Sequence, residues 1–312
     1  MSEPMADGIH CDTLPSNLNF PFNLRIHPSS PPTYSSDKCL IDDTNFGSHA
    51  QERAIRQYGI AGRVWEAAYM MNLYIHPPLH MEFDPPFIDI DATKAPQRLT
   101  IIELGSGTDL PEVCPLLEYN LQSVKSQLEC RSLQKSTLVV KPLSWGKPED
   151  ASALASEFFE QGPDKRVLNS LAHILCSDLI YFPELLGPLL RSLLHLSSPP
   201  FYSPSGDGPQ IILISYKLRS LAKEATFWSA FGLWFEFQPI LARDKLAASE
   251  WQRFGENFDD TSFLFTANRR LESYNWTIPE LDEDLLGGMG ANGTGTRKSD
   301  DTFENLLLMG LE

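Results

Sequence analysis

From residue 99 onward, short apolar runs alternate with longer segments of helical pattern, and this alternation limits the possible folds more than any other feature of the sequence. The apolar runs lack the in-and-out alternation of half-exposed strands and are typical of strands buried on both faces. Such strands are predicted at 99–104, 136–143, 171–178 and 210–217. An α/β fold follows, in which helices cover both faces of a mostly parallel sheet.

Helices are predicted between these strands and before the first of them. They span residues 62–75, 109–129, 148–161, 183–196 and 219–233. The end of the chain differs, because the apolar runs 234–241 and 303–311 have no convincing helix between them. These two runs predict an antiparallel strand pair at the C-terminal end of the sheet.

Composition divides the chain into two parts. Residues 1–45 are rich in Pro, Ser, Asp and Asn and are predicted to be disordered. Residues 46–312 are predicted to form one domain, with a loop at 76–98 and a flexible insertion around 282–301. The insertion includes the Gly-rich and polar stretch 287–301, which is unsuited to packing in a core.

Charge and cysteine content narrow the classes of function. The net charge of −16 argues against non-specific nucleic-acid binding, which requires a basic surface. The five cysteines form no CxxC pair, which favours reduced thiols in an intracellular protein. No apolar run reaches the roughly 18 residues of a membrane span, and the start of the sequence lacks the pattern of a signal peptide. We therefore expect a protein of the cytoplasm or the nucleus that binds neither nucleic acid nor membranes.

The turn Gly105-Ser106-Gly107-Thr108 directly follows the predicted strand at 99–104. Glycine-rich turns often do no more than reverse the chain. A turn at the carboxyl end of a parallel strand can also present backbone N–H groups to a ligand, and the sheet context favours this interpretation. Neither the GxGxxG pattern of dinucleotide sites nor the GxxxxGK[ST] pattern of P-loops is present.

Asp178 and Tyr181 come at the end of a predicted strand and just after it, so they should lie at the carboxyl edge of the sheet, where α/β proteins build their sites. In an isolated DxxY pattern, however, the Asp more often caps the next helix while the Tyr packs on it. Trp145 also follows a predicted strand, and it can either pack in the core or wall an adenine pocket. His76 and His80 have no evident third ligand, so no metal site is predicted.

Six segments, taken in order, resemble one family. They are VWEAA (64–68), IELGSGT (102–108), DLPEVCPLLEYNL (109–121), LSWG (143–146), SDLIYFPELL (177–186) and ISYKLR (214–219). The combination resembles the seven-β-strand, S-adenosylmethionine-dependent methyltransferases of the lysine-methyltransferase-like group, methyltransferase family 16, over about residues 60–311. The resemblance implies a Rossmann-like class I methyltransferase sheet, S-adenosyl-L-methionine as cofactor, and a substrate protein methylated on lysine. We expect the chain to be a monomer.

The resemblance also implies which residues hold the cofactor. The glycine motif of the family, which holds the methionine part of the cofactor, is matched by Glu103, Gly105, Ser106 and Gly107. The acid that binds the ribose is matched by Asp109, because the residues after it resemble those that follow the family's acid.

Four further residues match positions beside the cofactor or the substrate. Trp65 and Trp145 match two tryptophans of the family, of which the first helps hold the cofactor and the second lies near its adenine. Asp178 and Tyr181 match the DxxY motif that lines the channel for the substrate lysine. In this scheme Asp178 binds the incoming ammonium group, and Tyr181 adds a cation–π wall or a hydrogen bond.

The sequence departs from the family pattern at Thr108-Asp109. The family continues with a third glycine, a helix and a second strand before the ribose-binding acid, whereas here Asp109 directly follows the turn. The first helix and second strand look missing as one block, as in a skipped exon, a gene-model error or a truncated isoform. We expect the strand at 137–142 to close up beside 100–104. The chain is then either a lysine methyltransferase, with a small-molecule methyltransferase differing only in substrate, or a non-catalytic binding protein that has lost its cofactor site.

Overall fold

A five-stranded sheet forms the centre of the protein in the computed structural model. The model describes residues 26–29, 47–88, 99–106, 114, 117–118, 121–122, 137–159, 170–202, 209–247, 249–256 and 261–309. The strand order is β2-β3-β4-β8-β5. The strands are β2 (Thr100–Leu104), β3 (Leu171–Ser177), β4 (Ile211–Lys217), β5 (Phe235–Pro239) and β8 (Ser262–Arg269). β2, β3 and β4 are parallel, and β8 lies antiparallel between β4 and β5, so the predicted α/β fold is confirmed.

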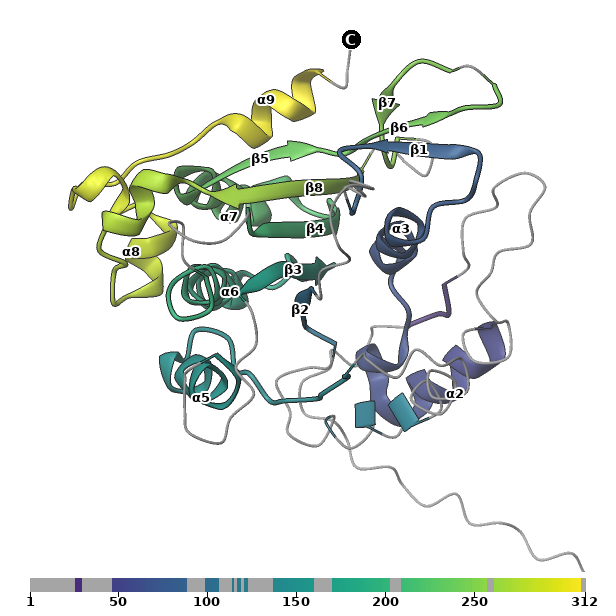
Figure 1. The fold of residues 1–312 in the computed structure, drawn as a ribbon, viewed down its shortest axis with the longest axis horizontal. Helices are drawn as coiled ribbons and strands as arrows, with labels where there is room; N and C mark the ends of the chain where they lie inside the picture. The colour runs from purple at the N-terminus through teal and green to yellow at the C-terminus, as the bar shows by residue number, and fades with distance from the viewer. Residues whose placement is uncertain are drawn as a thin grey trace, which may run out of the picture.

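Helices cover both faces of this sheet (Figure 1). One face carries α5 (Pro148–Phe158), α6 (Pro183–Leu196) and α7 (Leu221–Trp234), and the other carries α3 (Glu66–Ile75). Successive β4 residues serve the two faces in turn, as the pleat of a strand requires. Ile212 and Ile214 pack in the core with α5, α6 and α7, whereas Leu213 packs with Met70 and Met71 of α3.

The predicted C-terminal strand is wrong, because residues 302–309 form a helix, α9 (Thr302–Met309). Phe303, Leu306 and Leu307 pack on the core, and their spacing of three and four residues is helical. The ring of Phe303 stacks on Trp228 of α7 with centroids 4.7 Å apart. The antiparallel pair at the end of the sheet exists, but the partner of β5 is β8, where the sequence analysis predicted no strand.

The segment around 282–301, expected to be flexible, contains α8 (Asp282–Leu286) and the 3-10 helix η4 (Ala291–Gly293). Arg191 of α6 ties it to the core, because its Nε donates to Asp282 Oδ1 at 2.9 Å and its Nη1 donates to the carbonyl of Pro279 at 2.6 Å. Leu285 is fully buried. The mobility of this segment stays a prediction.

A second, three-stranded sheet lies partly in the predicted loop 76–98. Its strands are β1 (Met81–Asp84), β6 (Leu241–Asp244) and β7 (Gln252–Arg253), which pair antiparallel in the order β1-β6-β7. Three further elements were not predicted: α2 (Ser48–Tyr58) and the 3-10 helices η1 (Gly59–Gly62) and η3 (Leu271–Asn275). Ser29 belongs to the segment expected to be disordered, yet its backbone N–H donates to Gln51 Oε1 at 3.2 Å.

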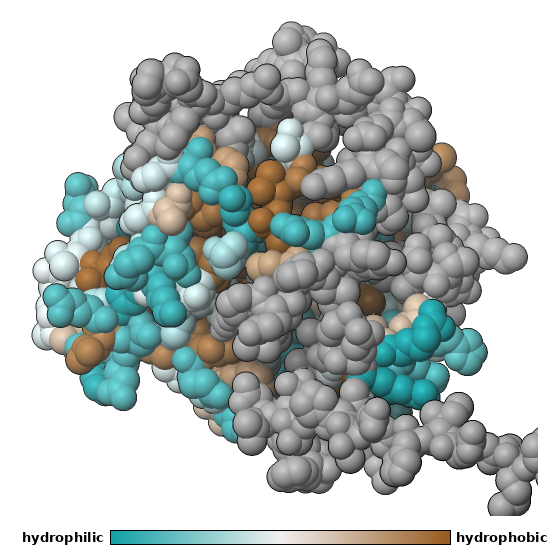
Figure 2. All heavy atoms as spheres, turned by 90° about the horizontal axis from the view of Figure 1, so that it is seen from below, coloured by the Kyte–Doolittle hydropathy of each residue, from teal (hydrophilic) through white to brown (hydrophobic). Residues whose placement is uncertain are grey.

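The expected closure of the sheet beside β2 is also wrong. Residues 137–144 contain neither helix nor strand, and in the described part of the chain β2 pairs only with β3. Strand propensity reflects packing against a neighbouring strand, so a β-branched run without such a neighbour does not form a strand. Val139 is 51% exposed and Ile101 of β2 is 41% exposed. Figure 2 looks from the side of β2 and α5 and shows hydrophobic surface among hydrophilic residues there.

The predicted helix 109–129 lies largely outside the described residues. Those that are described, 114, 117–118 and 121–122, are helical. The junction at Thr108-Asp109 and Gly107 also lie outside the described residues.

Candidate functional site

The carboxyl ends of β2, β3 and β4 meet at one edge of the sheet because these strands are parallel. The register pairs Leu104 with Cys176 and Ser177 with Ser215, so the residues that follow the three strands are neighbours. Gly105 follows β2 and Asp178 follows β3. The structure therefore brings together the turn at Gly105 and the carboxylate of Asp178, which the sequence analysis assigned to one site.

Gly105 fixes how closely the turn after β2 approaches the segment after β3. Its φ of +72° lies in the left-handed region that favours glycine. A Cβ added to Gly105 would lie 2.3 Å from Cδ2 of Leu179, the residue after Asp178. The positive φ therefore favours glycine at this position, and any side chain there would also have to push the Leu179 side chain aside.

Glu103 and Ser106 flank this turn. Partial removal from water raises the pKa of the Glu103 carboxyl, and a hydrogen bond with the Ser106 side chain opposes that rise. Part of the Glu103 side chain stays exposed, so solvent screening limits the effect. Burial raises the pKa of the Cys176 thiol on the neighbouring strand, and the charge of Glu103 adds to the increase. Cys176 is therefore a packed, protonated thiol and not a nucleophile.

Asp178 is held in an unusual backbone conformation. Its φ of +59° is rare for a residue with a side chain. Its backbone N–H donates to the carbonyl of Ser215 at 2.8 Å, which fixes it to the end of β4. The N-cap of α6 is Phe182, and no side chain caps that helix. The interpretation of Asp178 as the cap of the next helix is therefore wrong.

The carboxylate of Asp178 faces Arg219 instead. Arg219 Nη1 donates to Asp178 Oδ1 at 2.7 Å, and Nη2 contacts Oδ2. The Asp178 side chain is 2% exposed and that of Arg219 is 33% exposed. Burial disfavours the charge on Arg219, but the hydrogen bonds and the negative charge of Asp178 outweigh it and raise the pKa of the guanidinium. The result is a bidentate ion pair with a buried acid and a partly exposed base.

Arg219 also contacts the ring of Trp65. Trp65 is the N-cap residue of α3, and its ring centroid is 5.4 Å from Cζ of Arg219 and 4.6 Å from Cζ of Arg63. Ser215 Oγ donates to the carbonyl of Ala67 at 2.6 Å and so fixes the start of α3 to β4. The predicted site residues Trp65 and Asp178 are thus connected through Arg219.

Arg219 was not among the predicted site residues, although it ends the ISYKLR segment. Its position two residues after a buried parallel strand was a usable signal, because side chains at the carboxyl edge converge on one site. Glu224 on the first turn of α7 was also missed. It is buried, it contacts the hydroxyl of Tyr216, and it accepts hydrogen bonds from the backbone N–H groups of Arg219 at 3.2 Å and Ser220 at 3.1 Å. Glu224 therefore orders the segment that carries Arg219.

The two remaining predicted residues lie near α6. Tyr181 is half-buried, and its ring centroid is 4.5 Å from that of Phe182. Trp145 lies in the turn before α5 and packs on the core, while the N–H of Gly146 donates to Ser192 Oγ at 2.8 Å. These contacts support the core interpretation of Trp145, and its proximity to an adenine stays a prediction.

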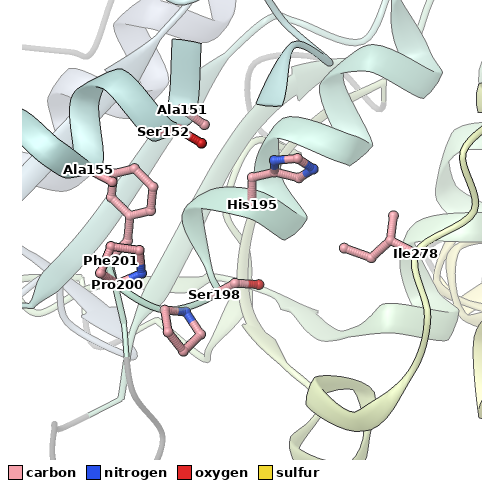
Figure 3. Close-up of a pocket in the computed structure, with 9 residues that line it drawn as sticks. Ala151, Ser152, Ala155, His195, Ser198, Pro200, Phe201 and Ile278 are labelled. Atoms are coloured by element: carbon pink, nitrogen blue, oxygen red, sulfur yellow. The ribbon is translucent and has the colours of Figure 1, made fainter. Parts of the chain in front are cut away.

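A cavity of roughly 290 Å³ lies at the opposite edge of the sheet (Figure 3). Its lining residues are Ala151, Ser152, Ala155, His195, Ser198, Pro199, Pro200, Phe201 and Ile278. The N–H of Leu171, the first residue of β3, donates to the carbonyl of Phe201, which places the cavity at the amino end of that strand. Burial lowers the pKa of His195, and the charges of Arg191 and Arg269 lower it further. This cavity is separate from the site around Asp178.

The described residues contain neither a candidate metal site nor a candidate membrane span. No group of three His, Cys, Asp or Glu side chains there could hold a metal ion. None of the helices in that part of the chain is both long and apolar enough to span a membrane.

Two comparisons with known proteins bear on this site. A family model described as lysine methyltransferase matches residues 49–231, which is more than half of the 312 residues. The chain is also similar to protein N-lysine methyltransferase METTL21A of Xenopus tropicalis, with 26% identity over 179 residues. That similarity covers 53% of this chain and 64% of the relative, so the chain matches less than two thirds of the relative's length.

Proposed function

The chain belongs to the lysine methyltransferase family, and we propose that it transfers a methyl group from S-adenosyl-L-methionine to a lysine side chain of a substrate protein. One observation carries the proposal. Asp178 places a buried carboxylate at the carboxyl edge of the sheet, and that carboxylate holds a cation beside the ring of Trp65. A carboxylate next to an aromatic ring is a suitable environment for an ammonium group.

The described part of the glycine turn fits the cofactor. Gly105, which has no side chain of its own, turns the backbone at the carboxyl end of β2, and Glu103 and Ser106 lie beside it. We propose that these three residues hold the methionine part of S-adenosylmethionine. Gly107 and Asp109, which the resemblance assigns to the cofactor, lie outside the described residues.

The chemistry requires a neutral amine. When bound, S-adenosylmethionine would supply an electrophilic methyl group: the new N–CH₃ bond would form as the S–CH₃ bond breaks, leaving a neutral thioether, and the proton of the lysine ammonium would pass to solvent beforehand. A free lysine side chain has a pKa of about 10.4 and is almost fully protonated at neutral pH. We propose that Asp178 binds the ammonium form and orients its nitrogen, and that Tyr181 lines the approach. Holding the two reactants in line is the main source of rate acceleration in such a transfer.

Incubation with a radiolabelled methyl donor tests this function. The purified chain and a version with the missing helix and strand restored are each mixed with cell lysate and the labelled cofactor. Label should appear on protein lysines, and Asp178→Asn should remove it from the restored version. Absence of protein label from both versions would contradict the proposal.

A second function, that of a non-catalytic binding protein, is favoured by one observation. Within the described residues β2 has no neighbour on its outer side, where the strand before the ribose-binding acid would lie. A chain without that strand keeps Asp178 and Trp65 but lacks the strand that, by the resemblance, leads to the ribose-binding acid. Label incorporation by the restored version alone would assign methyl transfer to the longer protein and binding to this chain.

A further inference from the structure

We propose that Arg219 occupies the cation-binding position of Asp178 and that a lysine side chain reaches this carboxylate only after Arg219 has moved aside. The identity of the incoming cation rests on the proposed function, whereas the existence of the cation site does not. Arg219 would then be a positioning residue that makes access to Asp178 conditional.

Both carboxylate oxygens of Asp178 already contact Arg219. Oδ1 accepts from Arg219 Nη1 at 2.7 Å, and Oδ2 contacts Nη2 of the same guanidinium. The carboxylate is 2% exposed, so its charge is already neutralised by one buried partner. An ammonium group can bind here only by replacing the guanidinium.

Arg219 is able to leave because its side chain is only partly enclosed. Its side chain is 33% exposed. Besides its bond to Asp178, Nη1 donates a hydrogen bond to the carbonyl of Lys217 at 3.1 Å. The space that Arg219 fills therefore opens to solvent. It has the Asp178 carboxylate at its inner end and the ring of Trp65 as a wall. These two groups suit a lysine ammonium as well as a guanidinium.

Displacement must be an exchange of one cation for another. Arginine stays protonated in proteins, and the charges of Asp178, Glu224 and Glu66 raise the pKa of Arg219 further. Arg219 therefore cannot leave by losing its proton. Glu66, whose charge already acts on Arg219 and which now pairs with Arg63, lies within reach as an alternative partner.

The exchange selects substrates by how they are presented. If the open form is populated at about 1–10%, the apparent affinity of any cation falls about 10- to 100-fold. A free lysine then binds poorly, whereas a lysine on a protein that docks elsewhere can compete with Arg219. The pair thus favours lysines within a bound protein over isolated amines.

Chemical rescue tests the exchange without cofactor or activity. In Arg219→Ala, the melting temperature should fall by roughly 5–15 °C, because Asp178 loses its partner. n-Butylammonium chloride at 100 mM, an analogue of the lysine side chain, should restore several degrees, and n-butanol or sodium chloride should not. The affinity of butylammonium for Arg219→Ala should exceed its affinity for the unaltered chain about 10- to 100-fold.

Two controls separate this site from general effects. Arg63→Ala removes the other guanidinium near Trp65 but leaves the Asp178 pair intact, so butylammonium should not stabilise it. The double variant Asp178→Asn/Arg219→Ala removes the carboxylate charge and should not respond either. If Arg219→Ala does not fold, Arg219→Met keeps the stem of the side chain and replaces it in each comparison.

Two outcomes would overturn the proposal: no butylammonium response, or an equal response in the double variant. If n-butylguanidinium rescues where butylammonium does not, the pair is built only for arginine. Failure of the methyl-transfer assay leaves the rescue measurement unchanged, so the two proposals fail separately.

Discussion

Replacing Gly105 with alanine tests whether the turn after β2 is held against the segment that carries Asp178. The φ of +72° costs a residue with a side chain about 1–2 kcal/mol. The added Cβ would also lie 2.3 Å from Cδ2 of Leu179. Because Leu179 is buried, its side chain has little room to move away, and overpacking adds about 1–3 kcal/mol. The free energy of unfolding should therefore fall by about 2–5 kcal/mol.

Urea unfolding followed by circular dichroism measures this loss, and Gly293→Ala is the matched control. Gly293 has a φ of +66°, but a Cβ added there would meet no atom within 4 Å. The control should lose only the backbone part, about 1–2 kcal/mol. In a Leu179→Ala background, Gly105→Ala should cost no more than the control, because the contacted methyl group is gone. Equal losses for the two glycine variants in the unaltered background would refute the steric reasoning.

Three further predictions concern the site and the pH dependence of stability. Asp178→Ala should abolish methyl transfer by the restored-length protein while leaving most of its cofactor affinity, as measured by label incorporation and calorimetry; unchanged turnover would remove the proposed role. Calorimetry should show that this chain binds S-adenosylmethionine weakly or not at all, with an affinity at least tenfold below that of the restored-length protein for each lost contact, or about 1.4 kcal/mol; micromolar affinity would show that the pocket re-forms. Burial lowers the pKa of His173, so below about pH 6.5 the unfolded chain binds a proton before the folded chain does. The free energy of unfolding should therefore decrease as the pH falls through that value, and less so in His173→Gln; identical pH profiles would contradict this.

The central part of the fold could be predicted from sequence because its segments are strongly patterned. Helix α6 has the bounds expected at 183–196, and β3 and β4 differ from the predicted strands by one residue each. Short apolar runs were harder to assign. The run at 303–311 was interpreted as a strand, since a few adjacent apolar residues fit either period.

Errors at the edge of the sheet have a different cause. Residues 137–144 have strand-like composition, but a strand also needs a partner, and composition carries no information about whether one is present. β8 was missed although its apolar run is visible at 263–265, because the final apolar run of the chain was assigned as the partner of β5.

The site was predicted in part. The positions of Gly105 and Asp178 followed from the rule that parallel strands end at one edge, and the resemblance added Trp65. Arg219 was missed because its pairing with Asp178 spans 41 residues and depends on how the segments after β3 and β4 face each other. Local sequence patterns contain no record of such a pairing.

The bond from Ser215 to Ala67 has a consequence for synthesis on the ribosome. The two residues are 148 positions apart. At about 5–20 residues per second, β4 is made roughly 7–30 seconds after the start of α3. Until then Met70, Met71 and Tyr74 of α3 lack the sheet face that later buries them. The newly made N-terminal half therefore carries an unburied apolar helix face until translation has reached β4.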